Sequence, residues 1–106
     1  MEGYTQKEKV ELYERAVKKW GADIQLIVII EEMAELTKAI IKDKRKPSEQ
    51  SAIKIMEEAV DVSIMLGQLF YILTNPKCGF MQSPEDIEQM VNKKLKKLEC
   101  KIEGCE

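Results

Sequence analysis

Apolar residues recur at the three- and four-residue spacing of an α-helix in four separate segments of the chain. Gly21, Pro47 and the segment 74–79 interrupt this spacing, and Ser83-Pro84 with Asp86 has the composition of a capped helix start. The predicted helices cover residues 5–19, 22–44, 49–73 and 84–102. The composition is 44% hydrophobic and 34% charged with five glycines and three prolines, which also favours long helices. We therefore expect an all-α fold.

The predicted helix 22–44 is apolar on every side, because the run 26–30 points all around the helix axis. Such a helix is covered on most sides, and a chain of 106 residues has little material to cover it with. Helices 22–44 and 49–73 are expected to form an antiparallel hairpin across Pro47. The sequence thus predicts a single domain over residues 1–106, a four-helix bundle of a helical hairpin plus flanking helices, completed by isologous dimerisation.

Two acidic clusters lie in the most apolar stretches of the chain. Their members are Glu31, Glu32 and Glu35 in the first and Glu57, Glu58 and Asp61 in the second. Residues three or four apart share a helix face, so Glu32 lies on one face with Glu35, and Glu58 with Asp61. In an antiparallel hairpin these two pairs converge. Like charges that close repel by on the order of a few kcal/mol per pair at an effective dielectric constant of about 20. The cluster therefore needs a compensating positive charge.

A divalent cation is one way to supply that charge. The chain has no histidine and so cannot make the Glu-x-x-His motifs of di-iron bundles. Sites built only from oxygen atoms suit Mg²⁺, Mn²⁺ or Ca²⁺. We expect Mg²⁺, with Mn²⁺ as a substitute, because Mg²⁺ commonly binds through few carboxylates plus substrate phosphates. The alternative is that these acids are ordinary exposed helix residues, with Lys38 and Lys54 as helical partners.

Charge, apolar runs and cysteines exclude several classes of function. A net charge of −2 disfavours binding to a nucleic acid polymer, and no glycine-rich phosphate loop points to a kinase or GTPase. No apolar run approaches the roughly 20 residues of a membrane span, and the start of the chain lacks an apolar signal core. Cys78, Cys100 and Cys105 are odd in number and lack Cys-x-x-Cys spacing. We expect neither a disulfide framework nor a zinc site, no membrane association, and a cytoplasmic location.

The acidic motifs resemble those of the MazG-like nucleoside triphosphate pyrophosphohydrolases. Glu-Glu-x-x-Glu at Glu31, Glu32 and Glu35 is followed by Glu-x-x-Asp at Glu58 and Asp61. Trp20-Gly21 and Gln25, which lead into the first motif, and the segment 57–69 are similar to the family as well. The likeness covers roughly residues 16–98, which is most of the chain.

This resemblance implies an all-α enzyme that hydrolyses nucleoside triphosphates to the monophosphate and pyrophosphate with Mg²⁺, as house-cleaning of the nucleotide pool, in a homodimer or homotetramer. It implies metal ligands at Glu32, Glu35, Glu58 and Asp61, and a part for Glu31 or Glu35 in orienting the attacking water. It implies substrate-binding roles for Lys54, Asn92, Lys94 and Lys97. Leu95 stands where the family has an aromatic residue, and Lys97 where it has an arginine. Lysine offers a point charge instead of a two-pronged clamp for phosphate.

The sequence leaves the base and the class of protein open. Non-standard or oxidised nucleotides, dUTP and dCTP, and canonical nucleoside triphosphates all fit the acidic motifs. The rival interpretation is a non-enzymatic helical bundle that binds another protein, with the helix 22–44 as its oligomer interface.

Overall fold

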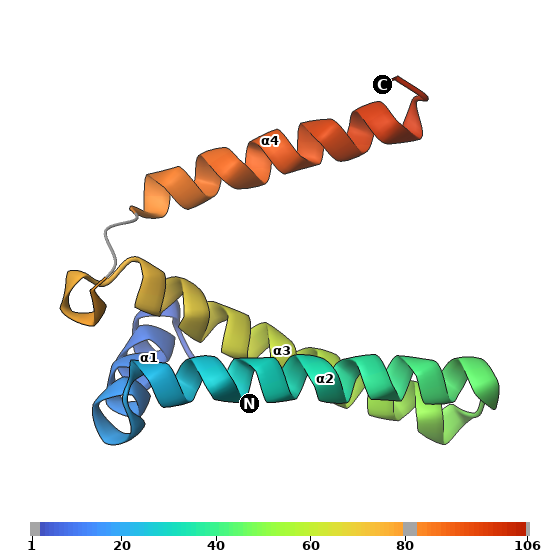
Figure 1. Ribbon diagram of the computed structural model, residues 1–106, viewed down its shortest axis with the longest axis horizontal. Helices are drawn as coiled ribbons and strands as arrows, with labels where there is room; N and C mark the ends of the chain where they lie inside the picture. The colour runs from blue at the N-terminus through green and yellow to red at the C-terminus, as the bar shows by residue number, and fades with distance from the viewer. Residues whose placement is uncertain (1–2, 80–82, 106) are drawn as a thin grey trace. The chain divides into compact units, whose positions relative to one another are not determined.

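Four α-helices and one short 3₁₀ helix make up the described chain in the computed structural model, which covers residues 3–79 and 83–105 without any strand (Figure 1). The prediction of an all-α fold is confirmed, and every predicted helix end lies within one residue of the observed one. The chain divides into two compact units, Met1–Ile72 and Leu73–Glu106. The prediction that the chain forms a single domain stays a prediction.

Helix α1 (Gln6–Trp20) begins with a capping box. The Thr5 hydroxyl accepts a hydrogen bond from the Glu8 N–H at 3.1 Å, and the Glu8 carboxylate accepts one from the Thr5 N–H at 2.9 Å. The backbone hydrogen bond from Thr5, followed by the bond to its side chain, lowers the pKa of Glu8. The helix ends at Gly21, whose φ of 88° is readily adopted only by glycine. The boundary of α1 therefore follows from its local sequence.

Helices α2 (Ala22–Arg45) and α3 (Glu49–Leu73) run side by side in opposite directions in the first unit (Figure 1). The turn between them is fixed by serines: the Ser48 hydroxyl accepts from the Ser51 N–H at 3.0 Å, as expected of a helix cap. The Ser51 hydroxyl then donates to the Asp43 carboxylate at 2.5 Å, which ties the start of α3 to the end of α2. The predicted hairpin across Pro47 is thus present.

Buried and half-buried positions recur on α2 and α3 at spacings of three and four residues, the pattern of a helical seam. On α2 the buried or half-buried positions of this seam are Gln25, Ile29, Glu32, Leu36, Ala39 and Asp43. On α3 they are Ser51, Ile55, Glu58, Val62, Met65, Gln68, Leu69 and Ile72. Glu32 and Glu58 therefore take positions that a seam of this kind normally fills with apolar residues. This placement brings the two carboxylates toward each other.

Helix α1 packs on α3 through tyrosine rings. The rings of Tyr13 and Tyr71 lie 6.4 Å apart between centroids with their planes at 50°. The Tyr13 hydroxyl oxygen lies so close to Gly67 that a Cβ atom at this position would be 2.7 Å away. Gly67 therefore lets the first helix approach the third.

The second unit contains the 3₁₀ helix η1 (Pro76–Cys78) and helix α4 (Pro84–Ile102). The predicted capping box of α4 is present, because the Ser83 hydroxyl accepts from the Asp86 N–H and the Asp86 carboxylate from the Ser83 N–H, both at 3.2 Å. None of the residues of α4, all of which the structure describes, is buried. Its predicted apolar stripe, including Leu95 and Leu98, is exposed or half-buried.

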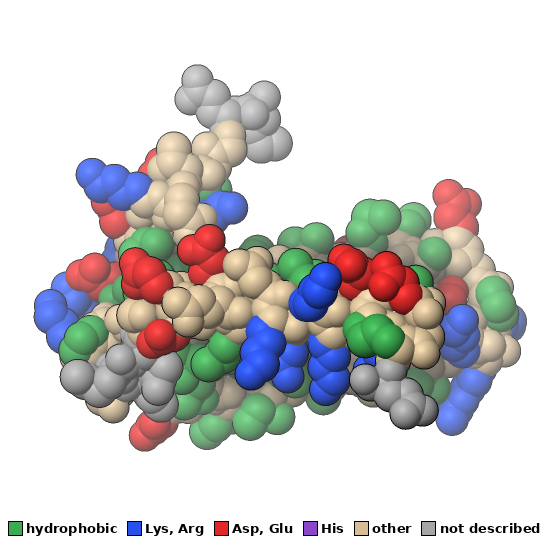
Figure 2. All heavy atoms as spheres, turned by 90° about the horizontal axis from the view of Figure 1, so that it is seen from above, with side chains coloured by type: hydrophobic (Ala, Val, Ile, Leu, Met, Phe, Trp, Pro, Cys, Tyr) green, Lys and Arg blue, Asp and Glu red, His purple; other side chains and the backbone are tan. Residues whose placement is uncertain are grey.

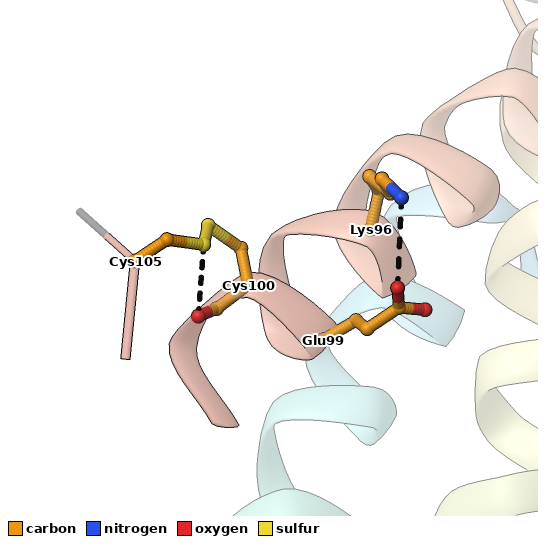
Figure 3. Close-up of a disulfide and its surroundings, with 4 residues drawn as sticks. All are labelled: Lys96, Glu99, Cys100 and Cys105. Atoms are coloured by element: carbon orange, nitrogen blue, oxygen red, sulfur yellow. Dashed lines mark hydrogen bonds and ion pairs between the residues drawn. A yellow bond between two sulfur atoms is a disulfide. The ribbon is translucent and has the colours of Figure 1, made fainter. Parts of the chain in front are cut away.

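A disulfide between Cys100 and Cys105 closes the end of α4 (Figure 3). The sequence does not predict this local pair, and the structure joins no further cysteine to it, because Cys78 is free. Gly104, with φ of 83°, turns the chain back so that the Cys105 N–H donates to the Cys100 carbonyl at 2.9 Å. This turn brings the two Cα atoms to 5.2 Å. Cys78 is a free cysteine.

Many large apolar side chains lie on the surface of the single chain, among charged ones (Figure 2). On α2 they are Ile24, Ile27, Ile30, Met33, Ile40 and Ile41. On α3 they include Ile53, Met56, Val60, Ile64 and Phe70. Within the first unit, α1 and α3 thus leave much of α2 exposed. Among the described helices, none combines the length and the apolarity that crossing a membrane requires.

Candidate metal centre

Three carboxylates from α2 and α3 come together in the first unit. Ligand oxygens of Glu32, Glu58 and Asp61 all lie within 4.8 Å of one another. Glu58 is buried, Glu32 is half-buried and Asp61 is exposed, so the group lies at the edge of the seam with one side open to water. A group of this kind fits a hard cation, because it offers only oxygen ligands and leaves room for water molecules in the coordination shell.

The seam determines which acids meet. Glu32 and Glu58 are seam positions on opposite helices, and Asp61 follows Glu58 by one turn on the same side of α3. The Ser51–Asp43 hydrogen bond ties the start of α3 to the end of α2. Three of the four predicted metal ligands are thus neighbours in the structure.

The pKa of Glu32 reflects the crowding of these carboxylates. Partial removal from water raises the pKa of Glu32, and the charges of Asp61, Glu58, Glu35 and Glu31 raise it further, in that order. Both causes oppose the ionised form of the carboxylate. A cation bound among the three carboxylates would remove this penalty.

Lys54 provides a positive charge beside Glu58. Its ammonium lies 2.9 Å from Glu58 Oε1, one helical turn away on α3. The Glu58 side chain is only 9% exposed, whereas that of Lys54 is 56% exposed. The hydrogen bond to Glu58, and then its charge, raise the pKa of Lys54. The alternative interpretation of the sequence predicts Lys54 as a helical partner of the acids, and the structure contains this pair.

Glu35 and Glu31 do not belong to the group of three. Both are exposed on α2. After Glu32 the seam continues at Leu36, so Glu35 lies beside the seam and not on it. Its charge still acts on Glu32 and on Lys54. The roles predicted for Glu35 as a ligand, and for Glu31 and Glu35 toward water, stay predictions.

The other predicted substrate-binding residues lie on α4. Asn92, Lys94 and Lys97 are all exposed there and belong to the second unit. Their predicted contact with phosphate stays a prediction.

Two buried glutamines extend the polar part of the seam, and the sequence reasoning gave neither of them a role. Gln25 on α2 and Gln68 on α3 are 5% and 4% exposed. The Oε1 atom of Gln68 is buried without a hydrogen-bond partner in the part of the chain that the structure describes. Gln25 precedes Glu32 by two turns and Gln68 follows Asp61 by two turns. Each glutamine is therefore seven residues from an acid of the group, a spacing that keeps two residues on the same helix face. This spacing is the signal in the sequence that identifies Gln25 and Gln68.

Comparisons with known proteins found no matching family model, no similar curated protein and no similar solved structure. The resemblance of the acidic motifs to MazG-like enzymes therefore rests on the motifs themselves.

Proposed function

We propose that this chain is a Mg²⁺-dependent nucleoside triphosphate pyrophosphohydrolase, which releases the nucleoside monophosphate and pyrophosphate, with Mn²⁺ as a substitute ion. The observation that carries the proposal is the group of Glu32, Glu58 and Asp61, whose ligand oxygens lie within 4.8 Å of one another on two antiparallel helices. These are the residues at which the two acidic motifs resemble those of the MazG-like family. The raised pKa of Glu32 supports the proposal, because partial removal from water and the neighbouring carboxylates oppose its ionised form, and a cation would offset this.

The donor set fits Mg²⁺ better than a softer metal. Glu32, Glu58 and Asp61 offer oxygen only, and the chain contains no histidine. These three residues would hold the ion, with Glu35 as a further ligand. When bound, Mg²⁺ would lower the pKa of a coordinated water and neutralise charge on the phosphates.

The chain's own residues would carry the remaining parts of the reaction. Glu31 or Glu35, exposed on α2 beside the group, would orient a water and accept its proton as the water oxygen attacks the α-phosphorus. The bond from the α-phosphorus to the bridging oxygen then breaks, and pyrophosphate leaves. Lys54 would stabilise the negative charge on the phosphates. Asn92, Lys94 and Lys97 would contact the phosphate tail.

The same proposal includes a second copy of the chain. Helix α2 carries six exposed large apolar side chains, and exposed apolar surface marks sites of association, so we propose a homodimer or homotetramer.

Release of pyrophosphate from a panel of nucleotides, with and without Mg²⁺, tests the activity. The panel contains canonical, deoxy and oxidised triphosphates, including dUTP and dCTP. We expect Mg²⁺-dependent release from at least one of them. Glu58→Gln and Asp61→Asn should lower the rate by about a hundredfold or more, because each removes a charged ligand while keeping the side-chain shape. No release from any nucleotide would contradict the proposal.

Glu14→Gln is the matched control. Glu14 also pairs with a lysine one turn away, Lys18, at 3.0 Å, but it lies on α1 outside the carboxylate group. This variant should keep the full rate. Thermal unfolding adds a readout of ion binding: Mg²⁺ at about ten times its dissociation constant should stabilise the wild type by about 1.4 kcal/mol. Glu58→Gln should lose this gain.

A second candidate function is favoured by a hollow of about 490 Å³ along α2. Its lining includes the apolar Ala34 and Ile41 and four cationic side chains, those of Lys38, Lys42, Arg45 and Lys46. A lining of apolar and cationic side chains suits an acidic protein partner, as a non-enzymatic interaction module would need. The nucleotide assay distinguishes the two functions, because an interaction module releases no pyrophosphate. In such a module, Glu58→Gln should leave binding of the partner unchanged.

A further inference from the structure

Glu58 belongs to two charge arrangements at once. It is one of the three carboxylates that converge, and its Oε1 atom is also 2.9 Å from the Lys54 ammonium. Because the Glu58 side chain is only 9% exposed, its charge depends on a positive group close by. Lys54 meets that need in the absence of an ion. A bound divalent cation would meet it too.

We propose that Lys54 is an internal counter-ion that a divalent cation displaces from Glu58, so that Lys54 and the ion compete for this carboxylate. The displaced ammonium then becomes available to phosphate groups only after the ion has bound. This inference rests on the proposed function, because it assumes that the carboxylate group binds an ion.

The two partners differ in their freedom to move. Glu58 is buried on the seam, whereas more than half of the Lys54 side chain is exposed. Lysine carries its charge on a flexible four-carbon stem and is readily hydrated, so Lys54 can leave Glu58 for water at little cost. An ion among the three carboxylates can contact all of them at once, while Lys54 forms its ion pair with Glu58 alone among the described residues. The exchange therefore favours the ion once it is present at sufficient concentration.

Binding of Mn²⁺ alone to the full chain tests the competition, with free Mn²⁺ measured by electron paramagnetic resonance. Lys54→Met removes the charge and keeps most of the stem. We expect it to bind Mn²⁺ about three- to tenfold more tightly than the wild type, the range covered by the loss of one partly exposed ion pair. Lys54→Arg keeps the charge and should stay within about twofold of the wild type.

Lys18→Met is the matched control. Lys18 pairs with Glu14 at 3.0 Å with the same separation along a helix, but both side chains are well exposed and lie outside the carboxylate group. The affinity of Lys18→Met for Mn²⁺ should equal that of the wild type. A gain of the same size in Lys18→Met would show that any loss of positive charge strengthens binding, and this would overturn the role of Lys54.

The outcomes separate this inference from the proposed function. A wild type that binds no Mn²⁺ contradicts both. A wild type that binds Mn²⁺, with Lys54→Met equal to it or weaker, leaves the metal centre intact and overturns the competition. If Lys54→Met fails to fold, nuclear magnetic resonance of the wild type decides: addition of Mg²⁺ should shift the Lys54 side-chain signals and leave those of Lys18 in place. Unshifted Lys54 signals in the loaded protein overturn the inference.

Binding of inorganic pyrophosphate tests whether the Lys54 ammonium becomes available to phosphate groups only after the ion has bound. With Mg²⁺ present, Lys54→Met should bind pyrophosphate about three- to tenfold more weakly than the wild type, because the freed ammonium is missing. Without Mg²⁺ the two proteins should bind it equally, since Lys54 is then held by Glu58. An equal loss with and without Mg²⁺ would show that Lys54 is available at all times.

Discussion

The Glu32 carboxylate makes the stability of the ion-free protein depend on pH. Its pKa is raised in the folded state by removal from water and by four neighbouring carboxylates, whereas it takes its ordinary value near 4.5 in the unfolded chain. Between these two values the folded state binds more protons than the unfolded state, so this group's contribution to stability falls as pH rises. Ionised Glu32 therefore destabilises the metal-free protein at neutral pH.

Glu32→Gln tests this sign. In a chelator, we expect the variant to melt at a higher temperature than the wild type at pH 7, and the difference to shrink as pH falls toward 4.5. Calorimetry across this range measures both. A variant that is less stable than the wild type at pH 7 without metal would contradict the crowding of the carboxylates.

Glu8→Gln is an informative control because folding shifts the pKa of Glu8 downward, whereas it shifts the pKa of Glu32 upward. The capping box lowers the pKa of Glu8, so its contribution to stability is present above its ordinary pKa and is lost as pH falls through the lowered value. Glu8→Gln should therefore lower the melting temperature at pH 7. Opposite signs for the two variants would tie each effect to its own carboxylate.

The approach of α1 to α3 depends on the missing side chain of Gly67. An alanine Cβ there would lie 2.7 Å from the Tyr13 hydroxyl oxygen and 3.2 Å from the ring carbon that bears it. Alanine favours a helix over glycine by about 1 kcal/mol, but overpacking costs about 1–3 kcal/mol. The Tyr13 ring also contacts Tyr71, which restricts its movement. We expect Gly67→Ala to lower the free energy of unfolding by about 1 kcal/mol.

A double-mutant cycle in urea checks the mechanism. Tyr13→Phe removes the closest oxygen, so Gly67→Ala should cost less in that background, with a coupling of at least about 0.5 kcal/mol. Ser63→Ala, at an exposed position one turn earlier on α3, should be neutral or slightly stabilising. If Gly67→Ala alone raises the free energy of unfolding, the contact with Tyr13 does not limit the packing of α1 on α3.

The helices could be predicted from sequence because their ends are encoded locally. Thr5 with Glu8, Gly21, and Ser83 with Asp86 each specify a boundary through bonds or dihedral angles within a few residues. The carboxylate group was only partly predictable. Helical spacing placed Glu35 with Glu32, but the seam between α2 and α3 continues at Leu36, and this depends on packing across the helices.

The bridge from Cys100 to Cys105 was missed for a related reason. It requires the positive φ of Gly104 after the end of α4, and the spacing of the cysteines alone does not reveal that turn. The sequence likewise pointed to Lys54 as a helical partner of the acids, but the burial of Glu58, which gives their ion pair its importance, appears only when α2 and α3 are paired.

Helices α2 and α3 of the first unit carry many exposed large apolar side chains. Ile30 is 66% exposed and Met56 is 67% exposed, and both lie on helices rich in other exposed apolar residues. Burying one such side chain in a partner contributes about 1.5–3 kcal/mol. We therefore expect the chain to associate with itself, which light scattering after size-exclusion chromatography measures as a dimer or tetramer.

Ile30→Asp should weaken this association by at least about tenfold, because a charge buried at a contact between copies costs more than the loss of the apolar side chain alone. Tyr4→Asp is the control: Tyr4 is equally exposed, at 67%, but it precedes α1 and lies on neither helix of the hairpin. It should leave the mass unchanged.

If Ile30→Asp also keeps the wild-type mass, the exposed face of α2 is not the contact between copies. A wild type that is monomeric at all concentrations would instead leave this apolar surface to another partner, as the interaction-module alternative requires.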